Sequence, residues 1–172
     1  MREVNQANAC PKYRISSIFN IKKSMKLAPA PLTPVQQDLA NTTASRTIAI
    51  EWRHLDVNGA TCIRCSETGK TLQQVIEQLA KEFAPQGVQV RFIETRLGEQ
   101  AIAQSNQILF NGVPLENVLA EVSVSSNACG SCSQLTQRET YCRTVEYEGK
   151  IYAEVPESII RKAALKAIGI AD

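Results

Sequence analysis

Residues 47–65 of the chain, TIAIEWRHLDVNGATCIRC, contain the pattern that decides the fold. The first part, Thr47–Trp52, is rich in strand-forming residues and predicts a β-strand. The segment Asp56–Ala60 is typical of a turn. Two cysteines, Cys62 and Cys65, follow the turn with two residues between them.

The residues after Cys65 predict a helix and a second strand. Apolar side chains recur at helical spacing from Leu72 to Phe83 and form one face of about three turns. Pro85 and Gly87 end this helix, and Val88–Ile93 reads as a strand. A strand, a helix and a strand in this order predict a βαβ unit with parallel strands.

The C-terminal half predicts antiparallel hairpins and a closing helix. Asn111-Gly112 and Glu148-Gly149 are the turn signals, and Pro114 places its strand at an edge or makes it short. The predicted elements are strands at 107–110, 113–115, 143–147 and 150–155, and a helix after Pro156. Residues 123–140 are polar and read as a cysteine-bearing loop insertion. The fold class is therefore α/β.

Composition bounds the remaining organisation. Residues 1–44 show no periodicity and predict a poorly ordered tail with an alternative start at Met25, before a domain at 45–172. Residues 1–30 carry six basic side chains against one acidic, whereas the rest carries 13 basic and 16 acidic. A mildly acidic domain argues against nucleic-acid binding. No segment reads as a membrane span or a secretory signal, so six cysteines indicate a reducing, cytoplasmic location.

Cys62 and Cys65 form a C-x-x-C motif at the predicted start of the helix. Unpaired N–H groups there stabilise a thiolate, and Arg64 adds positive charge. Cys62 is the expected nucleophile and Cys65 the resolving thiol. A metal half-site or two incidental thiols are the alternatives. Gly69 leaves open a helix that starts only at Thr71, with both cysteines in a loop.

A second cluster consists of Cys129, Cys132 and Cys142. Three cysteines with one further ligand suit a tetrahedral site for zinc or another soft ion. The fourth ligand is a cysteine of the first pair, the single histidine His54, or water. His54 has two other readings, a base near Cys62 or an ordinary surface or capping histidine. The competing interpretation of the cluster is a second thiol pair that relays electrons to the first.

Several of these motifs resemble an uncharacterised bacterial family, a domain of unknown function in the thioredoxin-like superfamily. The resemblance covers about residues 46–168 and rests on four stretches: Trp52-Arg-His-Leu55, Thr61–Cys65, Ser105–Glu116, and Cys129–Cys132 with Cys142-Arg-Thr144. It implies a thioredoxin-like fold with a thiol site at Cys62 and Cys65. Members of the superfamily usually place a cis-proline before the third strand, facing the cysteines, where this chain has Ser105-Asn106.

Three functions follow from these expectations. The first is a thiol–disulfide oxidoreductase with Cys62 and Cys65 as catalytic residues, whose partner is a thiol or disulfide protein or a small thiol. The second is a non-enzymatic protein that binds a soft metal or metalloid such as zinc, mercury or arsenic. The third is a thiol-dependent organometal lyase, which rests only on superfamily analogy.

Overall fold

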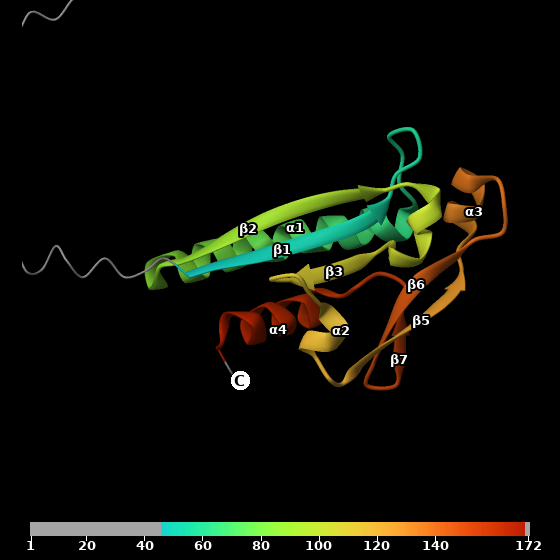
Figure 1. Cartoon of the computed structure of the whole chain (residues 1–172). Helices are drawn as coiled ribbons and strands as arrows, with labels where there is room; N and C mark the ends of the chain where they lie inside the picture. The colour runs from blue at the N-terminus through green and yellow to red at the C-terminus, as the bar shows by residue number, and fades with distance from the viewer. Residues whose placement is uncertain (1–45, 171–172) are drawn as a thin grey trace, which may run out of the picture. The chain divides into compact units, whose positions relative to one another are not determined.

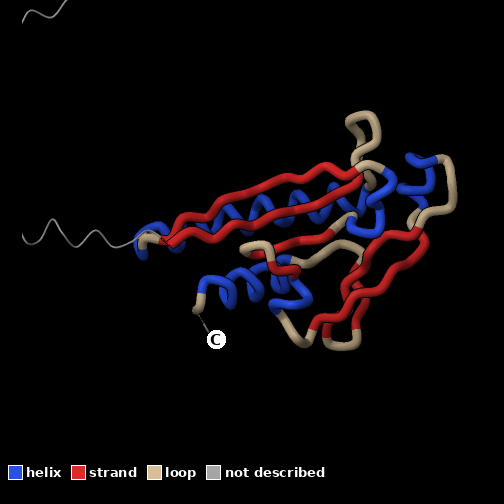
Figure 2. The backbone as a smooth tube through the Cα atoms, viewed as in Figure 1, coloured by secondary structure: helices blue, strands red, loops and turns tan. Residues whose placement is uncertain are grey.

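A computed structural model describes residues 46–170 of the chain (Figures 1 and 2). The predicted tail at residues 1–44, including Met25 and Cys10, lies outside the described residues, so its boundary at residue 45 stays a prediction. The elements in chain order are β1 (Arg46–Leu55), α1 (Ile63–Phe83), η3 (Ala84–Gln86), β2 (Val88–Leu97), η4 (Glu99–Gln104), β3 (Gln107–Phe110), β4 (Val113–Pro114), α2 (Leu115–Val118), β5 (Val122–Ala128), α3 (Gly130–Thr136), β6 (Tyr141–Tyr147), β7 (Lys150–Tyr152) and α4 (Glu157–Ile168).

The first sheet contains the predicted βαβ unit. Its strand order is β2-β1-β3-β4. Strands β1 and β2 are parallel from the pair Arg46 and Val88 to the pair Leu55 and Leu97, and α1 connects them. Strand β3 is antiparallel to β1, and β4 is the short edge strand expected from Pro114. The α/β class and this unit are confirmed.

Both predicted hairpin turns are present. Asn111 and Gly112 have φ of 52° and 80°, and Glu148 and Gly149 have φ of 52° and 72°. Positive φ at both central residues is the signature of a type I′ turn, which matches the twist of the flanking strands. The side chain of Asn111 also accepts a hydrogen bond from the N–H of Ala49 at 2.8 Å, which ties the first turn to β1.

The second sheet corrects the expectation of a cysteine-bearing loop over residues 123–140. Strands β5, β6 and β7 pair antiparallel in that order, and α3 lies between β5 and β6. The sequence pattern of β5 misled because it is an edge strand whose residues after Val122 are all exposed. Such a strand needs no apolar alternation of its own, since its backbone pairs with the half-buried β6.

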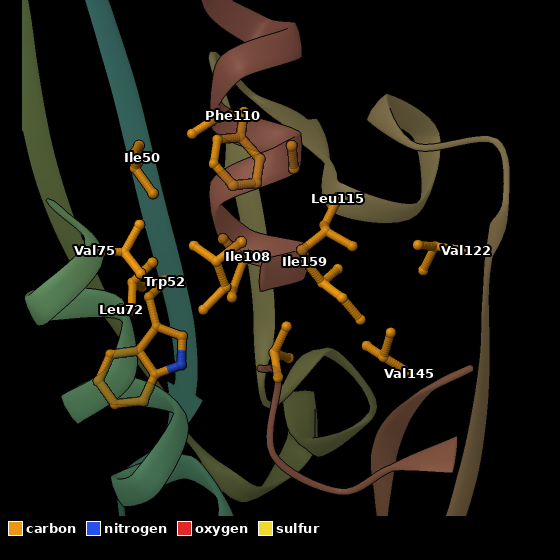
Figure 3. Packing of buried hydrophobic residues seen from close by; sticks show 14 of the residues in the cluster. Ile50, Trp52, Leu72, Val75, Ile108, Phe110, Leu115, Val122, Val145 and Ile159 are labelled. Atoms are coloured by element: carbon orange, nitrogen blue, oxygen red, sulfur yellow. The ribbon is translucent and has the colours of Figure 1, made fainter. Parts of the chain in front are cut away.

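One apolar core joins the two sheets. Helices α1 and α4 pack on the first sheet and on each other, and the core reaches the second sheet at Val122 and Val145 (Figure 3). The helix α1 begins at Ile63, as expected for a C-x-x-C motif at its start, and the alternative of a start only at Thr71 is wrong. The ring of Trp52 packs directly on Gly69, and a Cβ at this position would lie only 2.6 Å from the ring. Close packing against Trp52 therefore explains a glycine inside a long helix.

Candidate metal centre

Cys62 and Cys65 lie at the start of α1, where the sequence places them. Cys62 is the residue that caps the helix, with extended backbone at φ −74° and ψ 160°. Its Sγ accepts a hydrogen bond from the backbone N–H of Cys65 at 3.5 Å. The exposed fractions of the two residues are 1% and 0%. An N–H group at the helix N-terminus therefore faces a buried sulfur, which favours its thiolate form.

The other three cysteines surround the connection from β5 to β6. Cys129 directly follows β5, Cys132 lies in α3, and Cys142 is the second residue of β6. The N–H of Cys129 donates to the carbonyl oxygen of Thr140 at 2.9 Å. The hydroxyl of Ser133 donates to the carbonyl oxygen of Cys129 at 3.0 Å and accepts from the N–H of Thr140 at 2.9 Å. These bonds hold the α3 segment against the start of β6.

The fold brings one cysteine of the first pair to the second cluster. The sulfurs of Cys62, Cys129, Cys132 and Cys142 all lie within 4.8 Å of one another, and all four residues are buried. The sulfurs of Cys132 and Cys142 lie 2.8 Å apart. We call this set the four-sulfur cluster. Among the alternatives for a fourth ligand, the geometry selects a cysteine of the first pair.

The dimensions of the four-sulfur cluster suit a single ion. A tetrahedral zinc ion with Zn–S bonds of about 2.3 Å separates its sulfurs by about 3.8 Å. The 2.8 Å separation of Cys132 and Cys142 and the 4.8 Å limit for all pairs each differ from that spacing by about 1 Å. Small side-chain rotations therefore produce a tetrahedral set. Thiolates that ligate different irons of a multi-iron cluster lie farther apart, so one ion fits better.

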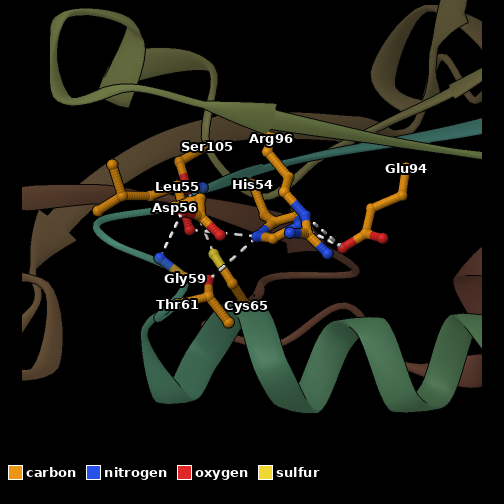
Figure 4. Close-up of polar contacts among 9 residues, drawn as sticks. All are labelled: His54, Leu55, Asp56, Gly59, Thr61, Cys65, Glu94, Arg96 and Ser105. Carbon is orange, nitrogen blue, oxygen red and sulfur yellow. Dashed lines mark hydrogen bonds and ion pairs between the residues drawn. The ribbon is translucent and has the colours of Figure 1, made fainter. Parts of the chain in front are cut away.

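Cys65 stands outside this set. Its Sγ lies 3.3 Å from the hydroxyl oxygen of Ser105, which also accepts the N–H of Leu55 at 2.9 Å (Figure 4). Ser105 precedes β3, where the resemblance places a residue that faces the cysteines. The structure thus places Ser105 against Cys65, while Cys62 belongs to the four-sulfur cluster.

The electrostatics favour a thiolate at Cys62. Hydrogen bonds from the thiols of Cys132, Cys142 and Cys65, with that from the Cys65 N–H, hold the pKa of Cys62 far below its ordinary value. The hydrogen bond to Cys62 and burial raise the pKa of Cys65 far above its ordinary value. The direction at Cys62 agrees with the sequence prediction. Its cause is the neighbouring thiols and one backbone N–H, not the charge of Arg64.

His54 is neither a ligand of this cluster nor a surface residue. It is buried, and its ring stacks on Trp52 with centroids 4.0 Å apart. Its Nε2 lies 2.8 Å from Glu94, and its Nδ1 lies 3.2 Å from the hydroxyl oxygen of Thr61 (Figure 4). Because Thr61 precedes Cys62, the histidine steadies the loop that enters the site. The expectations of a ligand and of a surface position are therefore both wrong.

Arg64 connects the two parts of the site. Its guanidinium Nη2 donates to the carbonyl oxygen of Ala128 at 2.9 Å. Ala128 is the last residue of β5 and precedes Cys129. The contact therefore joins α1, next to Cys62, to the second sheet, next to Cys129. The sequence shows the charge of Arg64 but contains no signal for this partner, which lies 64 residues away along the chain.

None of the helices within residues 46–170 combines the length and the apolar character that crossing a bilayer requires.

Comparisons with known proteins place the site in a wider context. The family model "Domain of unknown function (DUF2703)" matches residues 48–164, a range that includes all five cysteines of the described part. An uncharacterized protein of Archaeoglobus fulgidus is 32% identical over 117 residues, which cover 66% of this chain and 82% of that protein. No solved structure matches the chain. The expectation of a family of unknown function is confirmed, whereas the bacterial origin and the thioredoxin-like superfamily stay predictions.

Proposed function

The chain belongs to the DUF2703 family, and we propose that it binds a single soft metal ion, zinc or a chemically similar ion, through the thiolates of the four-sulfur cluster. The observation that carries the proposal is the convergence of four buried sulfurs within 4.8 Å. Soft thiolates select ions such as zinc over hard cations, and a set of four sulfurs suits tetrahedral geometry.

The number of ligands supports a binding role over metal-dependent catalysis. Catalytic zinc sites keep one position open for water or substrate, whereas sites with four protein ligands are closed. The burial of all four cysteines also supports a closed site, because an ion held there would be out of contact with bulk water. We therefore favour the non-enzymatic alternative over the oxidoreductase expected first from the sequence.

The ion would also link the two sheets. Cys62 enters from the first sheet and α1, and the other three ligands come from the β5–β6 segment. Because ligands scattered along the chain converge only in the folded state, the free energy of metal binding stabilises that state. Arg64 supports the same junction through its bond to Ala128.

The test is elemental analysis of the full chain, purified with reductant and without oxygen. We expect about one zinc-like ion per chain, in line with one closed four-ligand site. Cys142→Ser and Cys132→Ser should lose the ion, while the matched variant Cys65→Ser should retain it. Wild-type protein without metal, in which Cys132 and Cys142 form a disulfide that is reversibly reduced, would show that the cluster is a thiol relay instead.

A second candidate is the thiol–disulfide oxidoreductase of thioredoxin-like architecture. It is favoured by the position of Cys62 at the N-terminus of α1, with the Cys65 N–H aimed at its sulfur. The order of βαβ unit, hairpin strands and C-terminal helix also supports that architecture. A small disulfide or a thiol protein in the cytoplasm would be its partner. Reduction of a disulfide substrate by wild type, lost in Cys62→Ser and in Cys65→Ser, is the outcome expected for this alternative.

A further inference from the structure

Cys65 is the one cysteine in residues 46–170 that the four-sulfur cluster does not use. It is fully buried, and it lies one helical turn beyond the ligand Cys62. Its backbone N–H donates to the Cys62 sulfur, and its own sulfur lies against the hydroxyl of Ser105. A free thiol this close to a proposed metal ligand is in a position to form a disulfide with it.

We propose that Cys65 makes the metal site sensitive to peroxide, because oxidation joins Cys62 to Cys65 as a disulfide, removes Cys62 from the ligand set and releases the ion. This inference rests on the proposed metal-binding function and concerns its regulation.

The chemistry requires two steps and one equivalent of peroxide. The Cys62 thiolate attacks hydrogen peroxide, which breaks the O–O bond, forms a sulfenic acid at Cys62 and releases hydroxide. The Cys65 thiol then attacks that sulfur, and water leaves as the disulfide forms. In sum, one thiolate, one thiol and hydrogen peroxide give one disulfide, water and hydroxide. The two sulfurs are oxidised by two electrons, and the peroxide is reduced.

Position favours Cys65 as the resolving thiol. Side chains three residues apart on a helix have Cβ atoms about 5–6 Å apart, and a disulfide needs about 3.5–4.5 Å. Cys62 itself has extended backbone and lies just before the first helical residue. A modest movement of the loop that leads into α1 would therefore bring the two Cβ atoms to disulfide distance. The sulfurs of Cys132 and Cys142 lie 2.8 Å apart, but a bound ion would engage both as ligands, whereas Cys65 stays free.

Burial favours a small oxidant. With exposed fractions of 1% and 0%, Cys62 and Cys65 are out of reach of a bulky protein disulfide in the folded chain. Hydrogen peroxide is comparable to water in size, so local opening of the structure admits it more readily. Loss of Cys62 then leaves three ligands from one segment, and a site with an incomplete ligand set holds its ion more weakly.

The experiment uses the reduced full chain loaded with zinc. Zinc binding is first titrated in wild type, in Cys65→Ser and in the control Cys10→Ser. Both variants should bind zinc as wild type does, because the four-sulfur cluster supplies a full set of four ligands without either residue. Hydrogen peroxide is then added, zinc release is followed with a chromogenic chelator, and disulfides are mapped by mass spectrometry. Finally, a dithiol reductant is added to test whether the zinc is bound again.

Wild type and Cys10→Ser should release their zinc with a Cys62–Cys65 disulfide, and reduction should restore binding. Cys65→Ser should release zinc at least about tenfold more slowly, because no adjacent free thiol traps the oxidised Cys62. Equal release rates in wild type and Cys65→Ser, or a first disulfide that lacks Cys65, would overturn the inference without contradicting the proposed metal-binding function. A failure of wild type to bind zinc in the first titration would overturn the proposed function and the inference together.

Discussion

Replacing Gly69 with alanine tests how closely α1 packs on Trp52 of the first sheet. A Cβ at this position would lie 2.6 Å from Cη2 and 2.9 Å from Cζ3 of Trp52, which is closer than real side-chain contacts allow. The indole is buried, and it stacks on His54 with ring centroids 4.0 Å apart. The ring therefore has little freedom to move away from an added methyl group.

Two effects of opposite sign decide the outcome for Gly69→Ala. Alanine is the better helix former by about 1 kcal/mol in a helix interior. Overpacking a rigid core typically costs about 1–3 kcal/mol. Because two ring atoms lie under 3.0 Å from the added carbon, we expect an overpacking cost in the upper part of that range, about 2–3 kcal/mol. After the gain in helix propensity is subtracted, the free energy of unfolding should fall by about 1–2 kcal/mol.

Urea unfolding of the zinc-loaded protein, followed by circular dichroism, measures this change. Gly130→Ala is the matched control, since a Cβ there meets nothing within 4 Å and the variant should be as stable as wild type or more so. In a Trp52→Phe background the offending ring atoms are absent, so Gly69→Ala should no longer destabilise. Wild-type stability or better in the single variant Gly69→Ala would refute the packing argument.

Three other outcomes follow from contacts described above. The hydrogen bond from Arg53 lowers the pKa of Glu51 below its ordinary value of 4.5. The contribution of Glu51 to stability is therefore present above that value and is lost as pH falls through the folded pKa. Urea unfolding at pH 6 and near pH 3.5 should show a smaller acid-induced loss of stability for Glu51→Gln than for wild type. Removing the ion from wild type with a strong chelator under reducing conditions should lower the melting temperature measured by calorimetry, and an unchanged melting temperature would argue against an ion that links the sheets. Arg64→Met removes the hydrogen bond to Ala128 and keeps most of the aliphatic stem. In a chelator competition it should weaken zinc binding by about 10-fold or more, as loss of supporting contacts does at other metal sites. Equal zinc affinity in the variant and wild type would show that this contact has no role in the site.

The sequence predicted the parts of the fold that local patterns specify. Helical spacing in α1 and the turn dipeptides Asn111-Gly112 and Glu148-Gly149 act over a few residues, so the βαβ unit and both hairpins followed from them. Strand β5 was missed because serine and asparagine are common in loops. Its pairing with β6 is a tertiary effect that overrides the weak preference of its residues.

The candidate site divides in the same way. Both C-x-x-C motifs and Cys142 were evident as thiol chemistry from their spacing. The separation of Cys62 from Cys65 into different roles was not, because it depends on contacts between segments more than 60 residues apart. No periodicity or motif encodes the contact of Cys65 with Ser105 or that of Arg64 with Ala128.

The uneven origin of the four sulfurs has a consequence for the order of folding. Cys129, Cys132 and Cys142 lie within 14 residues of one another, whereas Cys62 lies 67 residues before the first of them. Closing the short loops costs less chain entropy than closing the long one, so the three nearby thiolates are the first able to hold an ion. An ion captured at that stage acquires its fourth ligand only when α1 docks beside the second sheet. The number of thiolates bound to such an ion during refolding would therefore report when α1 docks beside the second sheet.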